Sequence, residues 1–80
     1  MPFVYIVECA DGSLYTGWAV DVERRVKVHN TGRGARYTRM HGPVKLVYAE
    51  EQPDRVAAMK RELEIKRWPR EKKLKLIREQ

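Results

Sequence analysis

The sequence predicts an α+β fold: a small three-stranded antiparallel sheet flanked by helices, in the order ββαβαα. Short runs rich in Val, Ile, Tyr and Phe, bounded by turn residues, indicate the strands. Later segments with capping residues and apolar positions three or four apart indicate the helices. The chain has 80 residues, which is the size of one small domain. We therefore expect residues 1–80 to form a single domain.

The first two strands are expected at residues 3–9 and 14–19, joined by a loop that contains an Asp-Gly pair. A two-residue turn would place Tyr5 and Tyr15 on opposite faces of this hairpin. A three-residue loop with a left-handed Gly12 would place both tyrosines on one face. The residues themselves allow either loop, and two tyrosines can also be no more than good strand formers.

The first helix is expected at residues 22–30, because Asp21 can cap its beginning and Gly32 can end it. Arg25 and His29 are four residues apart and therefore share one face of this helix. The chain then continues through a long, polar and basic loop at residues 31–43 and a third strand at residues 44–50. Loops of this length in compact domains are usually functional or mobile.

The second helix is expected to begin near residues 53–54 and to end near Trp68, before Pro69. A last short helix follows Pro69. The positions expected to form the buried stripe of the second helix are Val56, Met59 and Leu63.

The net charge of +6 is unevenly distributed. Residues 1–23 contain four acids and no Lys or Arg, whereas residues 24–45 contain seven bases and no acid. Such a one-signed block, with aromatic residues among the arginines, is the pattern expected for binding a nucleic acid. We expect DNA rather than RNA. The residues expected to contact phosphates and stack on bases are Arg33, Arg36, Tyr37 and Arg39.

Cysteine content and hydropathy restrict the location of the protein. Cys9 is the only cysteine, and its place in an apolar strand fits a buried thiol in a reducing compartment. No apolar run approaches the ~18 residues of a membrane span, and residues 1–10 have no basic signal region. We therefore expect a cytoplasmic protein, monomeric or weakly dimeric, with no membrane partner.

Two glutamates of the second predicted helix have different surroundings. Residues at i−4, i−3 and i+3 from Glu62 are apolar, whereas Lys60 and Arg67 flank Glu64 in the manner of an ordinary solvated ion pair. A carboxylate at an apolar boundary loses solvation unless a metal ion or an arginine pairs with it. Helix geometry alone also allows Glu62 to lean out to water.

Two tripeptides, Phe3-Val4-Tyr5 and Tyr15-Thr16-Gly17, precede Arg25 and His29 on one predicted helix and Glu62 on another. This ordered set resembles the GIY-YIG nuclease superfamily, and in particular its small stand-alone bacterial members. In that family the tripeptides lie on the first two strands, and an arginine follows the second tyrosine by about ten residues. Phe3 stands where the first tripeptide has Gly, and Thr16 where the second has Ile. We expect this chain to lack the additional DNA-binding modules of larger members.

The resemblance implies one catalytic site built from Tyr5, Tyr15, Arg25, His29 and Glu62, and it therefore favours the three-residue hairpin loop. It implies a metal-dependent endonuclease that hydrolyses phosphodiester bonds in nucleic acid, in DNA repair or turnover. Glu62 would bind one divalent cation, Mg²⁺ or Mn²⁺, and Arg25 would offer a planar fork to phosphate beside His29. One of the tyrosines would act as the base, and which one is left open.

Four other interpretations carry less weight. Residues 53–54 and 64–66 spell a PD…ExK nuclease pattern, but both ends fall on one helix about 15 Å apart and cannot converge on a metal. A non-catalytic nucleic-acid-binding module would use the basic loop at residues 31–43, yet has no use for Glu62 beside phosphates. A protein–protein adaptor explains neither the charge block nor the ordered set. Two histidines and one cysteine far apart in the sequence do not suggest a zinc site.

Overall fold

The structure is a computed structural model that describes residues 1–31 and 42–79. Its described residues form three strands and three helices in the predicted order ββαβαα. The elements are β1 (Phe3–Cys9), β2 (Leu14–Ala19), α1 (Val22–Asn30), β3 (Val44–Glu51), α3 (Arg55–Lys66) and α4 (Arg70–Arg78). No helix in these two segments is long and apolar enough to cross a membrane.

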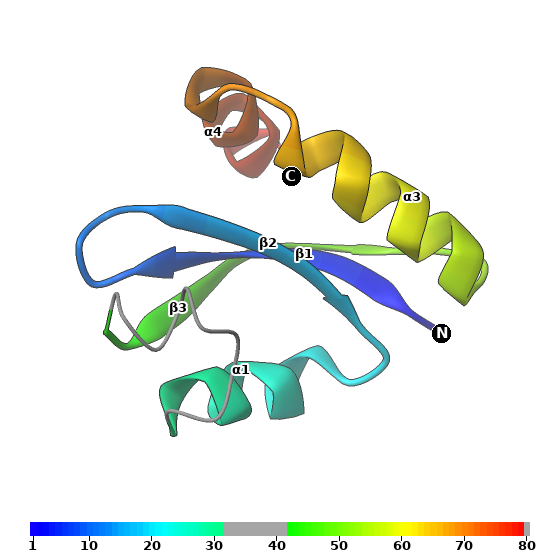
Figure 1. Cartoon of the computed structure of the whole chain (residues 1–80), viewed down its shortest axis with the longest axis horizontal. Helices are drawn as coiled ribbons and strands as arrows, with labels where there is room; N and C mark the ends of the chain where they lie inside the picture. Colours follow the sequence, from blue (N-terminus) through cyan, green and yellow to red (C-terminus); the bar gives the residue numbers. More distant parts are fainter. Residues whose placement is uncertain (32–41, 80) are drawn as a thin grey trace.

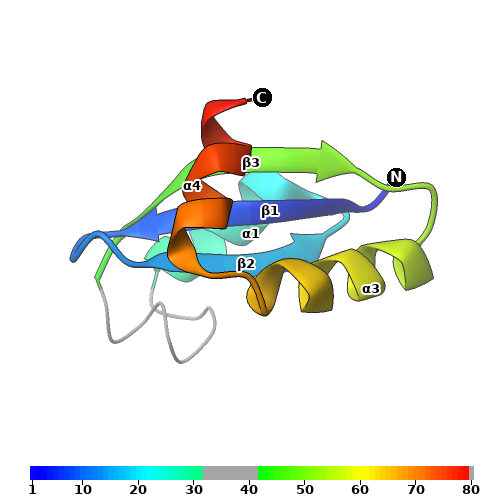
Figure 2. The same cartoon turned by 90° about the horizontal axis from the view of Figure 1, so that it is seen from above.

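The sheet is antiparallel with strand order β2-β1-β3, so β1 is its central strand and β2 one of its edges. Helix α1 covers one face of the sheet, and α3 and α4 cover the other (Figure 1). Helix α3 runs along the strands, whereas α4 runs across them (Figure 2). The alternating side chains of β1 therefore belong to two separate clusters of buried residues. Tyr5, Val7 and Cys9 face α1, and Val4 and Ile6 face α3 and α4.

The hairpin between β1 and β2 has the three-residue loop. The backbone N–H of Cys9 donates to Ser13 O at 2.8 Å, the N–H of Gly12 donates to Cys9 O at 2.9 Å, and Gly12 has a φ of 86°. Tyr5 consequently pairs with Gly17 and Val7 with Tyr15. Because the side-chain period of a strand is two, this register places both tyrosines on the face that α1 covers.

Both ends of α1 are fixed by side chains. At the first end, Asp21 accepts a hydrogen bond from the backbone N–H of Arg24 at 3.1 Å, as the sequence predicts. At the last, Asn30 Nδ2 donates to Val44 O at 3.1 Å, and Asn30 Oδ1 accepts from Val44 N at 2.6 Å. This pair of hydrogen bonds ties the end of α1 to the beginning of β3. Gly32, the predicted helix stop, lies outside the described residues.

Helix α3 begins after Asp54, whose carboxylate accepts from the backbone N–H of Ala57 at 2.8 Å. The prediction of its buried stripe is wrong. The fully buried residues of α3 are Ala58 and Ile65, which pack against the sheet. The predicted positions are exposed: Val56 by 60%, Met59 by 50% and Leu63 by 52%.

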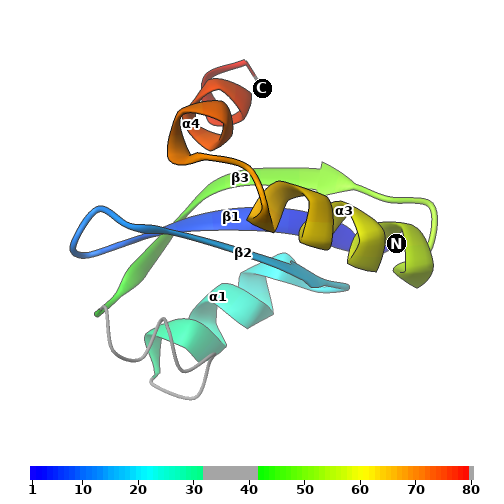
Figure 3. The same ribbon diagram turned by 45° about the horizontal axis from the view of Figure 1, so that its top comes forward.

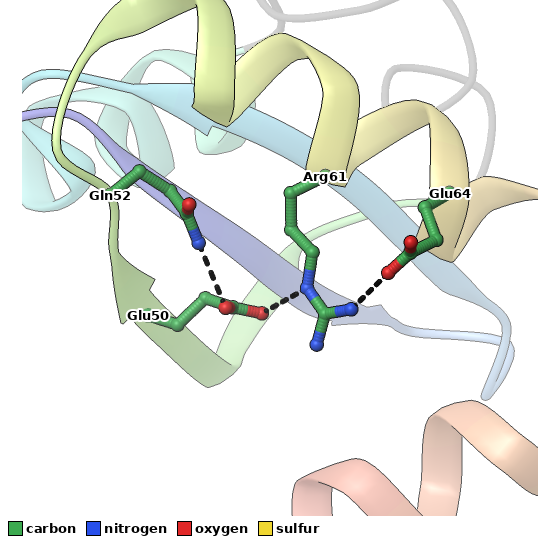
Figure 4. A network of polar contacts seen from close by, with 4 residues as sticks. All are labelled: Glu50, Gln52, Arg61 and Glu64. Carbon is green, nitrogen blue, oxygen red and sulfur yellow. Dashed lines mark hydrogen bonds and ion pairs between the residues drawn. The ribbon is translucent and has the colours of Figure 1, made fainter.

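A polar network explains this orientation of α3 (Figure 4). Arg61 Nε donates to Glu50 Oε1 on β3 at 3.0 Å, and Arg61 also pairs with Glu64. Gln52 Nε2 donates to the other oxygen of Glu50 at 2.9 Å. The guanidinium of Arg61 lies over the ring of Trp68, 5.0 Å from its centroid. Charged side chains thus occupy part of the inward side of α3, and small or aliphatic residues fill the rest.

Candidate active site

A pocket of about 760 Å³ lies at the edge of the sheet formed by β2. Figure 3 shows α3 running beside this edge on one side of the sheet and α1 on the other. All five residues of the predicted catalytic set line this pocket, from β1, β2, α1 and α3. They are Tyr5, Tyr15, Arg25, His29 and Glu62.

Tyr5 reaches the pocket from the central strand by crossing over Gly17 of the edge strand. A Cβ atom at position 17 would lie 2.6 Å from the Tyr5 hydroxyl and 2.8 Å from Cζ. Only a residue without a side chain therefore leaves the phenol of Tyr5 its place. Tyr5 is only 2% exposed, so its ring is part of the core while its hydroxyl lines the pocket.

His29 lies between the two phenols. Its Nε2 atom is 2.9 Å from the Tyr5 hydroxyl, and its ring makes edge contacts with Tyr5 and Tyr15 at centroid distances of 6.1 and 5.6 Å. The imidazole is buried, at 3% exposure, whereas Arg25, one turn earlier on α1, is exposed. Arg25 and His29 therefore line the pocket from the same face of α1, Arg25 as an exposed residue and His29 as a buried one.

Burial and local charge keep this hydrogen bond between neutral groups. Burial lowers the pKa of His29, and the positive charge of Arg25 lowers it further. Burial raises the pKa of Tyr5, as do Tyr15 and Glu62 nearby, against an opposing effect of Arg25. Near neutral pH, a neutral phenol thus faces a neutral imidazole, and the hydroxyl can donate to Nε2 of the ring.

Glu62 faces the pocket from α3 with its side chain 18% exposed. Its Oε1 atom lies 3.5 Å from Lys66 Nζ, so the partner of this carboxylate is a lysine one turn later on the same helix. The same ammonium lies 5.6 Å from the centroid of the Tyr15 ring. Glu64 pairs with Arg61. The sequence had suggested Lys60 and Arg67 as its partners.

Two further arginines, which the sequence did not single out, line the pocket. Arg24 precedes Arg25 on α1, and Arg55 is at the beginning of α3. Arg55 and Glu62 are seven residues apart, so two helical turns place them on the same side of α3. This spacing from Glu62 was the signal in the sequence that could have identified Arg55 as a site residue. Arg24, Arg25 and Arg55 thus place three positive charges around the pocket, against the two negative charges of Asp21 and Glu62.

The donor atoms of the pocket fit a cation that keeps most of its own water. Among the described residues, no three His, Cys, Asp or Glu side chains come together in a group that could hold a metal ion. A zinc site, which needs three or four protein ligands, does not fit these residues. Mg²⁺ is commonly held by one or two carboxylates together with substrate phosphate. Glu62 beside a cleft lined by arginines meets that requirement.

The PD…ExK pattern does not form a site, because Asp54 caps α3 while Glu64 is bound to Arg61 further along the same helix. The residues predicted to dock nucleic acid lie outside the described residues, so their role stays a prediction. They are Arg33, Arg36, Tyr37 and Arg39.

The hairpin register, the pocket and the helix order define a GIY-YIG domain. The family model described as the GIY-YIG catalytic domain matches residues 1–75, and the chain therefore belongs to the GIY-YIG family. Members of this family are generally endonucleases, which suggests a nucleic acid as the substrate.

Within the family, the chain is similar to small proteins called UPF0213. The UPF0213 proteins of Staphylococcus aureus strains Mu50 and N315 are 58% identical to it over 77 residues, which cover 96% of this chain and 94% of theirs. The solution NMR structure of a UPF0213 protein from Bacillus halodurans has 49% identity and a TM-score of 0.60. That match covers 96% of this chain and 83% of the other.

Proposed function

We propose that this chain is a metal-dependent endonuclease that hydrolyses phosphodiester bonds in nucleic acid, working as a single domain. The observation that carries the proposal is that one pocket gathers two phenols, an imidazole, a carboxylate and arginines from four elements. Hydrolysis of a phosphodiester needs a group that accepts a proton from water and positive charge around the phosphoryl oxygens. This pocket has both kinds of group within a single cleft.

Arg25 binds the scissile phosphate, with Arg24 and Arg55 on the adjoining walls. A guanidinium is always charged and presents a planar fork that matches phosphate oxygens. Arg25 suits this role best, since it is exposed and its charge already acts on Tyr5 and His29.

The two tyrosines have different roles. Tyr5 is buried, bonded to His29 and held in its neutral form, so its hydroxyl positions the attacking water or a phosphate oxygen. Tyr15 is less buried and lines the same pocket, and it is therefore the phenol that relays the proton of the attacking water, accepting it as its own hydroxyl proton passes on to solvent. His29 fixes the Tyr5 hydroxyl and packs against the Tyr15 ring.

Glu62 would hold one divalent cation, Mg²⁺ or Mn²⁺. When bound, such an ion supplies positive charge beside the phosphoryl and leaving oxygens and makes water more acidic. The substrate is DNA in preference to RNA, in repair or turnover within the cytoplasm. The excess of basic residues in the chain supports a polyanionic substrate.

The test is cleavage of labelled single-stranded DNA, duplex DNA and RNA with Mg²⁺, Mn²⁺ or EDTA. We expect Glu62→Ala and Arg25→Ala each to lower turnover by about 10²–10³ or more, because each removes a preorganised charge. Glu64→Ala is the matched control, since it removes a carboxylate from the same helix whose partner is Arg61.

Near-wild-type cleavage by Glu62→Ala or Arg25→Ala would overturn the assignment. Binding without cleavage, unchanged in Glu62→Ala, would instead indicate a non-catalytic nucleic-acid-binding module that uses the basic loop at residues 31–43. The three substrates in the same experiment distinguish DNA from RNA and single strands from duplexes.

A further inference from the structure

A lysine stands beside the pocket on the α4 side. Lys66 is the last residue of α3, and its ammonium lies 3.5 Å from Glu62 Oε1 and 5.6 Å from the centre of the Tyr15 ring. The contact with Glu62 is an ion pair, and an ammonium has three N–H donors. The side chain is 42% exposed, so the ammonium is accessible to a ligand that extends out of the pocket.

A second lysine lies near the beginning of α4, the helix that follows α3 after residues 67–69. Lys73, on α4, is partly buried, and burial together with the charge of Lys66 lowers its pKa. Among residues 1–31 and 42–79, no carboxylate lies within ion-pair distance of Lys73. Two ammonium groups brought together, one of them partly buried, oppose folding unless an anion lies near both.

The other lysines of α4 make different contacts. Lys72 lies over the ring of Trp68, 4.3 Å from its centroid. Lys75 is paired with Glu79 at 4.0 Å, and both side chains are well exposed. Lys66 therefore stands out as the lysine beside the pocket, and Lys73 as the lysine of α4 with no carboxylate within ion-pair distance among the described residues.

We propose that Lys66 and Lys73 form a second phosphate-binding site, which holds the backbone of the nucleic-acid strand where it leaves the pocket towards α4. The inference rests on the proposed function, because it takes the same strand to be the substrate. The strand would run from the arginine walls, past Glu62, and onto the surface shared by the end of α3 and the beginning of α4. This site consists of described residues and does not involve the basic loop at residues 31–43.

Binding measured in EDTA, where no metal supports cleavage, tests the site. A labelled DNA oligonucleotide, single-stranded or duplex, and its RNA counterpart are titrated over a range of salt concentrations. The logarithm of the binding constant falls as the logarithm of the salt concentration rises. Losing two phosphate contacts should make this slope less steep by about 1.4 for a single strand or about 1.8 for a duplex. We expect that reduction in the double variant Lys66→Gln/Lys73→Gln.

The matched control is Lys60→Gln/Lys75→Gln, which removes one charge from each of the same two helices at exposed positions. It should keep the wild-type slope, and Lys66→Arg/Lys73→Arg should keep most of it. Equal slopes in the Lys66→Gln/Lys73→Gln and control variants would overturn the inference. If that double variant does not fold, Lys73→Gln alone should reduce the slope by about 0.7–0.9, and an unchanged slope would be equally decisive.

The inference and the proposed function can fail separately. A protein that binds with the predicted loss of slope yet never cleaves supports the phosphate site and contradicts the endonuclease. A protein that cleaves with metal and shows equal slopes in all variants supports the endonuclease and contradicts the phosphate site.

Discussion

The hydroxyl of Tyr5 occupies the space that a side chain at position 17 would need. The conflict would involve the rigid ring of a residue in the central strand, since a methyl carbon at position 17 would lie 2.8 Å from Cζ as well as 2.6 Å from the hydroxyl. Gly17→Ala must therefore displace Tyr5 from Nε2 of His29. A displacement near 1 Å in a catalytic site can cost about 10²-fold in rate, and we expect a loss of that order in cleavage assays.

Thr16→Val is the control for Gly17→Ala. Thr16 is the neighbouring residue of β2, points to the opposite face of the sheet and does not line the pocket. Its buried hydroxyl has no hydrogen-bond partner among the described residues, so the isosteric valine leaves no group unpaired. Normal cleavage by Gly17→Ala, or an equal loss in Thr16→Val, would contradict a specific role for Gly17.

At single positions, the sequence pointed to the side chains that line the pocket better than to the glycine that makes room for one of them. The spacing of Tyr15 and Arg25 is visible in a linear sequence because each fixes its own place on a strand or helix. The requirement for glycine at position 17 is not visible in the linear sequence, because it depends on the pairing of Gly17 with Tyr5 across the hairpin. Only the three-residue loop produces that pairing.

At the scale of elements, the strands and helices were predictable and the orientation of α3 was not. Strand composition, the caps Asp21 and Asp54, and Pro69 are local signals, and the structure confirms the elements that they indicate. The rotation of a helix about its axis is usually inferred from its apolar residues. On α3 the inward side also carries two charged residues: Glu62 lines the pocket, and Arg61 binds Glu50 of β3. Judging the rotation from the apolar residues alone therefore selected the wrong side of the helix.

The junction between α1 and β3 depends on Asn30. Its side chain makes two hydrogen bonds with the backbone of Val44, and each such bond is worth roughly 0.5–1.5 kcal/mol. Asn30→Ala should therefore lower the free energy of unfolding by about 1–3 kcal/mol in urea titrations. Thr31→Ala is the control, because the Thr31 hydroxyl bonds only one turn back, to Val28 O. An Asn30 variant no less stable than that control would contradict this role of the junction.

At the scale of the whole molecule, the pKa of His29 makes stability depend on pH. In the unfolded chain His29 titrates near a pKa of about 6.5, whereas in the folded protein burial and Arg25 lower its pKa. Below about pH 6.5 the unfolded state thus binds more protons, so the free energy of unfolding falls as the pH decreases. Urea titrations from about pH 7.5 to about pH 5.5 should show a steeper fall for the wild type than for His29→Gln.

The second histidine, His41, is present in both proteins of that comparison, so its contribution to the pH dependence cancels. Parallel pH dependences would contradict a lowered pKa for His29. Among the described groups that shift the pKa of this imidazole, Arg25 is the charged one, so Arg25→Gln should make the fall shallower without removing it.

The gathering of the site is a property of the whole molecule that local patterns could not reveal. The resemblance to GIY-YIG proteins placed five residues together, and the structure shows why they can meet: β2 is an edge strand, so α1 and α3 reach the same pocket from opposite faces of the sheet. Arg24 followed only from that three-dimensional arrangement, whereas Arg55 had its seven-residue spacing from Glu62 as a signal in the sequence.

The distribution of the pocket along the chain has a consequence for protein synthesis. Tyr5 leaves the ribosome before the residues of β3, so its strand lacks that neighbour until residue 51 has been made. The wall that carries Glu62 comes later still, with α3. A nascent chain therefore presents arginines and phenols before the carboxylate can join them, and the complete pocket forms only after Glu62 has been made.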